Sequence, residues 1–237
     1  MKHVLTALNG LVWLVLITSF LQVLAGSGAP FVQTADEKLK IIFGADDGLL
    51  FDASLVDAPP FAEQHLVDLG SGSGAVVRSA TRLGGFGSAS GYEINPALYG
   101  ISVAMSSRAA AERFTLGSLW DALVDDADVV VVYALPELQD AMGTKLAHEC
   151  KVGALIVSNA YAFPNAESLG LQLLREQRVE TSWWNPDGTS SLWLYRVRGV
   201  PDPRGGSGGR GGGSFVRSTY RLVHQDGWLR PAASADE

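Results

Sequence analysis

The segment "VDLGSGSG", Val67 to Gly74, constrains the fold more than any other part of the chain. The run "HLVDL" (65–69), which leads into the glycines, is typical of a buried strand, and apolar residues at helical spacing begin near Ala75. A strand, a glycine-rich loop and a helix make the first half of a βαβ unit, whose loop lets a ligand approach the backbone. We therefore predict a parallel sheet covered by helices.

The chain continues the same alternation of apolar runs and helical patterns. Strands are predicted in "SASGYEI" (88–94), "RFTLGSLW" with its exit loop (113–120), "ADVVVVYAL" (127–135) and "GALIVSNAY" (153–161). The "VVVV" run is apolar on both faces, which favours a central strand.

Helices are expected between these strands. Asn95 and Pro96 form a helix start, with a cap residue followed by proline at the first position. The buried stripe of that helix is predicted at Leu98, Ile101 and Met105. The segment "PELQDAMGTKLAHEC" (136–150) is predicted to be a helix, with Leu138, Met142, Leu146 and Cys150 at successive i+4 positions.

The end of the domain departs from the alternation. "RVETSWW" (178–184) and "SLWLYRVR" (191–198) resemble strands, and the six residues between them are too few for a parallel crossover. They should form an antiparallel hairpin. A mainly parallel, seven-stranded sheet that ends in such a hairpin is the plan of the Rossmann-like class I methyltransferase fold, and not of the symmetrical dinucleotide-binding fold.

Asp68 distinguishes between the ligands that such a glycine loop can bind. Gly70, Gly72 and Ala75 satisfy the dinucleotide pattern G-x-G-x-x-A, with Glu93 about twenty residues further on. A carboxylate at position 68 would repel the pyrophosphate of NAD. S-adenosylmethionine has no phosphate and carries an ammonium and a sulfonium, so the same carboxylate favours it.

Glu93 follows the second predicted strand and is suited to accept hydrogen bonds from two ribose hydroxyls. Parallel strands place their carboxyl ends at one edge, where open α/β sheets bind ligands. The predicted cofactor-binding residues at this edge are Asp68, Gly70, Ser71, Gly72, Glu93, Ile94, Asn95, Ser118 and Leu119.

Several motifs together resemble a known family. "FVQTAD", "VDLGSGSG", "GYEINPAL", "LGSLWD", "VVVVYALPELQDAMGTKL" and "GALIVSNAYAFP" are similar to the mitochondrial protein-lysine methyltransferases of the adenine nucleotide translocase and the ATP synthase c subunit, from about Pro30 to Arg198. The resemblance implies methyl transfer from S-adenosylmethionine to a lysine amine of a protein in the mitochondrial inner membrane.

Two positions differ from the family pattern. Ser73 stands where relatives usually have an acid in "GSGDG", and Ser118 stands where an acid commonly reads the adenine amino group. A neutral partner binds more weakly than a charged one. An alternative therefore remains open, in which a degenerate methyltransferase fold serves as a structural subunit of a membrane complex.

The residues after the fourth predicted strand are candidates for catalysis. Methyl transfer needs alignment of amine and methyl group, and the lysine amine must lose its proton. Tyr133, Pro136 and Glu137 lie where they could orient the amine or line a lysine channel. Tyr133 could equally pack as a strand-end aromatic, and Glu137 could be a first-turn acid favoured by the helix dipole. Gln33 and Thr34 could cover the cofactor or form a connecting turn.

The two ends of the chain differ from the domain between them. Residues 4–25 carry no charge and have about the length of a membrane-spanning helix, with a cleaved signal peptide as the alternative. Residues 1–29 are thus predicted to be a membrane segment, residues 30–199 a methyltransferase domain and residues 200–237 a glycine-rich tail. The location expected from the family is the mitochondrial inner membrane, with another membrane as the alternative.

Charge and histidine placement bear on other functions. The net charge of −7 argues against general nucleic-acid binding, which needs clustered Lys and Arg. The four histidines show no metal-ligand spacing, so no metal is expected. An NAD-dependent oxidoreductase is a third hypothesis, and it lacks a Tyr-x-x-x-Lys pair or a suitably placed catalytic histidine.

Overall fold

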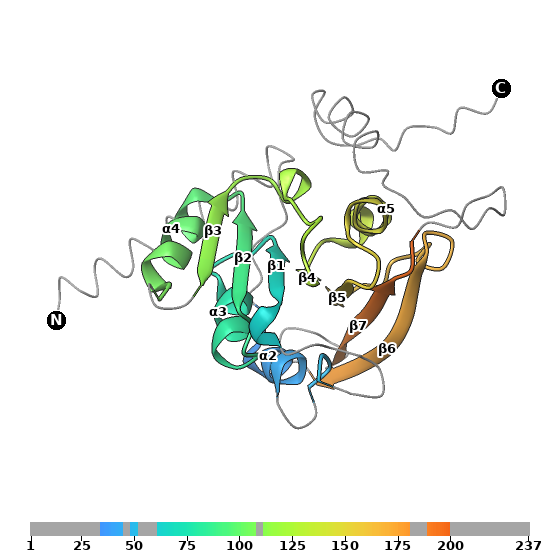
Figure 1. Cartoon of the computed structure of the whole chain (residues 1–237), viewed down its shortest axis with the longest axis horizontal. Helices are drawn as coiled ribbons and strands as arrows, with labels where there is room; N and C mark the ends of the chain where they lie inside the picture. Colours follow the sequence, from blue (N-terminus) through green and yellow to red (C-terminus); the bar gives the residue numbers. More distant parts are fainter. Residues whose placement is uncertain (1–33, 45–47, 52–60, 108–110, 181–188, 200–237) are drawn as a thin grey trace.

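The computed structural model describes residues 34–44, 48–51, 61–107, 111–180 and 189–199 (Figure 1). The predicted membrane segment (1–29) and glycine-rich tail (200–237) lie outside these residues, as does Gln33. Among the described residues, none of the helices combines the length and apolar character needed to cross a bilayer.

The described strands form a seven-stranded mixed sheet with the order β3-β2-β1-β4-β5-β7-β6. The strands are β1 (His65–Leu69), β2 (Ser88–Glu93), β3 (Glu112–Leu116), β4 (Val129–Val132), β5 (Leu155–Asn159), β6 (Leu171–Glu180) and β7 (Thr189–Val197). β1 to β5 pair in parallel, whereas β7 pairs antiparallel with both β5 and β6. The predicted parallel sheet with a terminal antiparallel hairpin is therefore confirmed.

Two hydrophobic cores cover the two faces of this sheet. On one face, α2 (Asp36–Phe43) and α3 (Ala75–Arg82) pack against alternate residues of β1, β4, β5 and β7. On the other face, α5 (Gln139–Glu149) packs against the residues between them. Figure 1 shows α2 between α3 and one end of the β6–β7 hairpin. Because side chains alternate along a strand, the parity of a residue decides which core it faces.

Of the remaining helices, one 3₁₀ helix precedes β1, whereas the others follow the carboxyl ends of β2, β3 and β4. α4 (Pro96–Met105) begins at Asn95, whose Oδ1 accepts from the amides of Ala97 (2.9 Å) and Leu98 (3.2 Å), as the cap prediction required. The short 3₁₀ helices are η1 (Phe61–Glu63), η2 (Leu119–Asp121) and η3 (Pro136–Leu138).

Three predicted details were wrong. Met105 is the last residue of α4 and is 54% exposed, and α4 buries Leu98 and Ser102 instead. The helix predicted from Pro136 begins as the 3₁₀ turn η3, and α5 starts only at Gln139. β6 begins at Leu171, seven residues before the predicted strand, because it pairs along the whole of β7.

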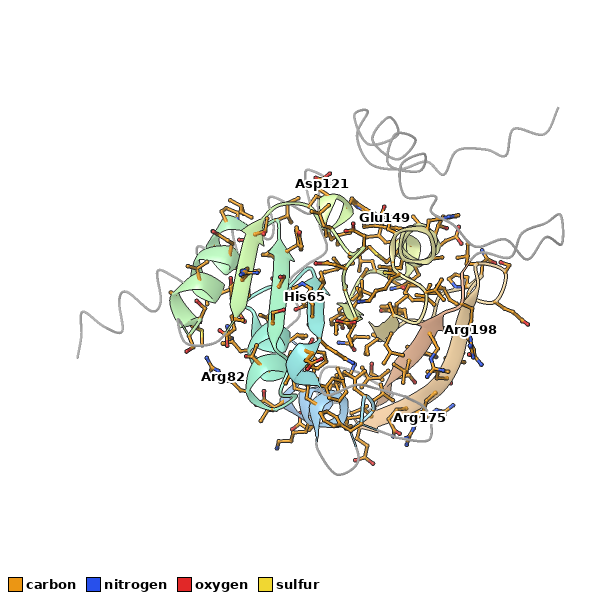
Figure 2. The ribbon with its side chains drawn as sticks, viewed as in Figure 1. His65, Arg82, Asp121, Glu149, Arg175 and Arg198 are labelled. Atoms are coloured by element: carbon orange, nitrogen blue, oxygen red, sulfur yellow. The ribbon has the colours of Figure 1, made fainter. Side chains whose placement is uncertain are left out.

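Charged side chains gather at the rim of the fold. Figure 2 shows Arg175 and Arg198 along the β6–β7 hairpin, whereas Arg82 lies on the opposite side beside α3. Arg82 there contacts Glu112 of β3 at 3.6 Å. Asp68, Glu93 and Lys38 are buried instead. Water therefore does not stabilise their charges as it does at the surface.

Candidate functional site

The glycine loop after β1 is bound to the end of β2 by its own amides. The backbone N–H groups of Gly70 and Ser71 both donate to the carbonyl oxygen of Tyr92, at 2.9 Å. Gly70, Gly72 and Gly74 all have positive φ values (83°, 55° and 83°), which other residues adopt only with strain. The glycines therefore let the chain turn sharply between β1 and α3 beside the second strand.

Glu93 fixes the same loop through its side chain. Its Oε2 accepts from the Gly72 amide and its Oε1 from the Asn95 amide, both at 2.7 Å. Burial raises the pKa of Glu93, while the hydrogen bonds from these backbone amides act in the opposite direction. Each carboxylate oxygen has a second lone pair, so Glu93 can hold the loop and still accept a ligand hydroxyl.

Asp68 is a buried acid in the strand itself. Only 4% of the residue is exposed, and burial together with the nearby Glu93 raises the pKa of Asp68 to about 8. The cost of burying a carboxylate falls when a cation comes close. Asp68 is therefore an acid whose ionised form a cationic ligand would stabilise.

Ser71 and Gly91 lie against each other between the loop and β2. A Cβ on Gly91 would lie 2.6 Å from both Cβ and Oγ of Ser71, so the strand needs glycine there. The Ser71 hydroxyl is buried and has no hydrogen-bond partner among the described residues. Buried hydroxyls are normally paired, so this one leaves a donor and an acceptor for a further group.

The other predicted cofactor-binding residues lie at the ends of β2 and β3. Ile94 is 38% exposed at the end of β2, while Asn95 is buried and caps α4. Ser118 caps η2, since its Oγ accepts from the Trp120 amide at 3.2 Å, and Leu119 begins η2. Their contact with a cofactor stays a prediction.

Tyr133, Pro136 and Glu137 lie on the exit from β4. Tyr133 is half-buried, and burial raises the pKa of its hydroxyl. Pro136 and Glu137 lie in η3 and are exposed. Gln139 shapes this segment, because its buried Nε2 donates to the Ala134 carbonyl at 3.0 Å. The structure brings Tyr133 to the carboxyl edge of the sheet, and the catalytic roles of all three residues stay predictions.

Sequence reasoning missed a polar cluster beside Tyr133. Lys38 of α2 donates to Asn159 Oδ1 and, at 2.7 Å, to Ser190 Oγ, and its Nζ lies 5.8 Å from the centre of the Tyr133 ring. Asn159 Nδ2 donates in turn to Thr34 Oγ1 at 3.4 Å. Two signals could have indicated this cluster. Lys38 is one of the buried residues of α2, and Asn159 ends the apolar strand β5.

Ala160 shows that the backbone beside this cluster is strained. It follows Asn159 directly and has a φ of 74°, the left-handed region that alanine seldom adopts. Such strain costs on the order of 1–3 kcal/mol and is found most often near functional sites. Thr34, which the sequence placed over the cofactor or in a turn, precedes α2 and contacts this cluster.

The polar groups at this edge match a cofactor with hydroxyls and cationic groups. It combines two buried carboxylates, an unpartnered hydroxyl at Ser71 and glycines that leave the backbone open. Clusters of three or more potential metal ligands do not occur among the described residues.

Comparisons with known proteins agree with this geometry. Residues 68–169 match the family model described as the ANTKMT methyltransferase domain. The adenine nucleotide translocase lysine N-methyltransferase of Mus musculus is 31% identical over 142 residues, which cover 56% of this chain and 54% of that protein. The Mus musculus lysine N-methyltransferase of the ATP synthase c subunit is 28% identical over 153 residues, covering 61% and 52%.

A solved structure supports the fold. An RNA methyltransferase from Salinibacter ruber, in complex with S-adenosyl-L-homocysteine, superposes with a TM-score of 0.54 at 20% identity, covering 73% of this chain and 97% of that one. The chain spans about half the length of the curated relatives named above. The resemblance drawn from the sequence motifs is confirmed: over residues 68–169 this chain carries a domain similar to the ANTKMT methyltransferase domain.

Proposed function

We propose that this protein is an S-adenosylmethionine-dependent protein-lysine N-methyltransferase. The observation that carries the proposal is the pairing of Asp68 and Glu93, two buried carboxylates at the ends of adjacent strands around an open glycine loop. Asp68 would repel a pyrophosphate and complements an ammonium or a sulfonium, while Glu93 can accept from ribose hydroxyls.

The residues at this edge have distinct roles in the proposed binding. Glu93 accepts from the ribose hydroxyls while it holds the Gly72 amide, and Asp68 faces the cationic amino-acid end. Gly70 and Gly72 let the backbone approach, and Ser71 supplies its unpartnered hydroxyl. When bound, S-adenosylmethionine supplies a methyl group already activated by its positive sulfur.

The protein must then hold a neutral lysine amine in line with that methyl group. Tyr133 lies at the carboxyl end of β4, two positions beyond Val131, which is paired with Asp68. Its half-buried ring and hydroxyl can orient an incoming amine and exclude water from it. Loss of water around an ammonium favours the neutral form that can attack.

The proposed substrate is a protein of the mitochondrial inner membrane, such as the adenine nucleotide translocase or the ATP synthase c subunit. The names of the similar enzymes support this choice. The uncharged run at residues 4–25 fits an enzyme whose target lysine lies near a membrane surface.

The first experiment asks for methyl transfer directly. Purified protein is incubated with radiolabelled S-adenosylmethionine and mitochondrial membranes from cells that lack the gene. We expect label in one small membrane protein, on lysine. Glu93→Gln should reduce labelling at least about tenfold because the variant loses a charged acceptor.

The matched control is Glu63→Gln, since Glu63 is an exposed acid of η1 away from the glycine loop. It should label as the wild type does. If the wild type bound S-adenosylhomocysteine and labelled nothing, the enzymatic proposal would be wrong. If it neither bound the product nor labelled membranes, the structural-subunit alternative suggested by Ser73 and Ser118 would be supported.

A further inference from the structure

Lys38 is a buried cation that the proposed mechanism does not use. It lies on the face of α2 that also buries Leu39, Ile42 and Phe43, and only 5% of the residue is exposed. Lysine is almost never so buried unless its charge is compensated. An apolar side chain would suit this position in the core better, so the charge itself requires an explanation.

The described residues supply only neutral partners for the Lys38 ammonium. These are Asn159 Oδ1, Ser190 Oγ and the face of the Tyr133 ring. No Asp or Glu among the described residues lies within ion-pair distance of Lys38. An ammonium has three donors, and two of them meet these oxygens. The arrangement therefore accommodates an additional anionic acceptor.

Side-chain alternation places Lys38 and Asp68 at the same face and edge of the sheet. Leu66, Val131, Val157 and Leu192 face the core under α2, so Asp68, Tyr133, Asn159 and Ser190, each an even number of residues away, point to the same side. Tyr133 and Asn159 each extend one residue past paired positions of β4 and β5. The cation and the acid thus share one layer above the carboxyl ends of the strands.

The spacing between these charges suits a small zwitterion. β1 and β5 are separated by β4 alone, which puts them roughly 10 Å apart at two strand spacings. A hydrogen bond of about 3 Å at each end leaves room for one amino-acid group between the two side chains. Asp68 offers a negative charge to its ammonium, and Lys38 offers a positive charge to its carboxylate.

We propose that Lys38 binds the α-carboxylate at the amino-acid end of the cofactor, opposite Asp68. The inference rests on the proposed function. It names a partner for the negative α-carboxylate, which the carboxylates of Asp68 and Glu93 cannot bind. Asn159 and Ser190 hold the Lys38 amine in place, and Tyr133 covers it. α2, which lies outside the matched segment 68–169, thereby becomes part of the cofactor site.

The ionisation of Lys38 is consistent with this role. Burial lowers the pKa of Lys38 to about 8, because the neutral partners around it do not offset the loss of water. A bound carboxylate would raise that pKa again and keep the amine charged. The Tyr133 ring faces the Lys38 amine. Burial raises the pKa of the Tyr133 hydroxyl, which therefore stays neutral at the pH where Lys38 titrates.

The test compares two ligands that differ only in the carboxylate. Calorimetry measures the binding of S-adenosylhomocysteine and of its decarboxylated analogue to the full chain. The wild type should bind the carboxylate-bearing ligand at least about tenfold more tightly, as expected for a charge-assisted hydrogen bond. Lys38→Met should lose this preference and bind both at the weaker level. Lys40→Met, an exposed lysine on the same helix, should keep it.

Each outcome decides the inference. Equal binding of the two ligands by the wild type, or an unchanged preference in a folded Lys38→Met, overturns it while leaving the proposed function intact. Failure of the wild type to bind S-adenosylhomocysteine overturns both. If Lys38→Met does not fold, the wild-type comparison alone decides, because it needs no variant.

Discussion

Asp68 and Lys38 show that, at the scale of single residues, this site holds its charges at a cost to the fold. Burial shifts both toward the neutral form, raising the pKa of Asp68 to about 8 and lowering the pKa of Lys38 to about 8. Burying an ionisable group without an opposite charge destabilises the folded state. Such positions are expected where a ligand later supplies the missing partners.

Asp68→Asn should therefore change how stability depends on pH. The folded pKa of about 8 lies above the ordinary value of 3.8, so the folded state binds the proton more tightly than the unfolded state. This contribution is complete below about pH 4 and is lost as the pH rises through 8. Relative to Asp68→Asn, the wild type should lose up to about 6 kcal/mol of unfolding free energy over this interval.

Urea unfolding at pH 5, 7 and 9 measures this difference. Taking wild type minus Asp68→Asn cancels the titrating groups that are not coupled to Asp68 as Glu93 is. Lys38 is one of these, and its lowered pKa makes stability increase with pH above about 8. Parallel stability curves for the two proteins would show that Asp68 titrates near its ordinary value.

The sequence identified Asp68 and Glu93 but not Lys38 or Asn159, for a physical reason. A carboxylate before a glycine loop and another about twenty residues later are signals carried by local spacing. Lys38 and Asn159 are 121 residues apart and meet only through the packing of α2 on the sheet. Neither spacing nor composition contains that contact.

At the scale of elements, the glycine loop is held in place by hydrogen bonds to the end of β2. The amides of Gly70, Ser71 and Gly72 are all bound to the last residues of β2. Gly91 allows the Ser71 side chain to lie against that strand. The sequence motif predicted the loop and its helix, but it did not indicate that a glycine in the neighbouring strand completes the support.

Gly91→Ala should destabilise the protein by about 1–3 kcal/mol, because its new Cβ would lie 2.6 Å from Ser71. Ser71→Gly in the same chain should recover most of the loss, since it removes the opposing atoms. Gly100→Ala is the control: nothing lies within 4 Å of that Cβ on α4, and alanine favours a helix. Thermal melts of the four proteins give the comparison, and no recovery in the double variant would exclude this contact as the cause.

The 3₁₀ turn η3 marks a limit of sequence patterns at this scale. The positions from Leu138 to Cys150 have a single helical period, which predicted a helix from Pro136 onward. Gln139 instead binds the Ala134 carbonyl and tightens the first turn. This hydrogen bond orients the segment that carries Pro136 and Glu137. A polar side-chain contact of this kind cannot be predicted from hydrophobic periodicity.

At the scale of the whole molecule, the two faces of the sheet differ. The face covered by α2 carries the charged residues of the site, whereas the face covered by α5 carries a hydrophobic core that stabilises the fold. The core under α2 lies beside Asp68, Lys38, Tyr133 and Asn159. The core under α5 contains the alternate strand residues, whose side chains point to the opposite face. The strand pattern predicted the sheet and its hairpin correctly, since apolar runs and short connections determine them. Which face α2 covers depended on long-range packing.

The two faces should respond differently to the same loss of packing. Ile42 on α2 and Leu146 on α5 are both fully buried, one in each core. Replacing either with alanine removes the same number of carbon atoms and should cost about 2–5 kcal/mol.

Ile42 lies one helical turn after Lys38, so Ile42→Ala should also displace the Lys38 amine and weaken S-adenosylhomocysteine binding severalfold. Leu146→Ala should bind the ligand as the wild type does. Calorimetry under conditions where both variants are folded separates the effects, because a loss of affinity in both, or in neither, would mean that the face carrying α2 has no special connection to the site.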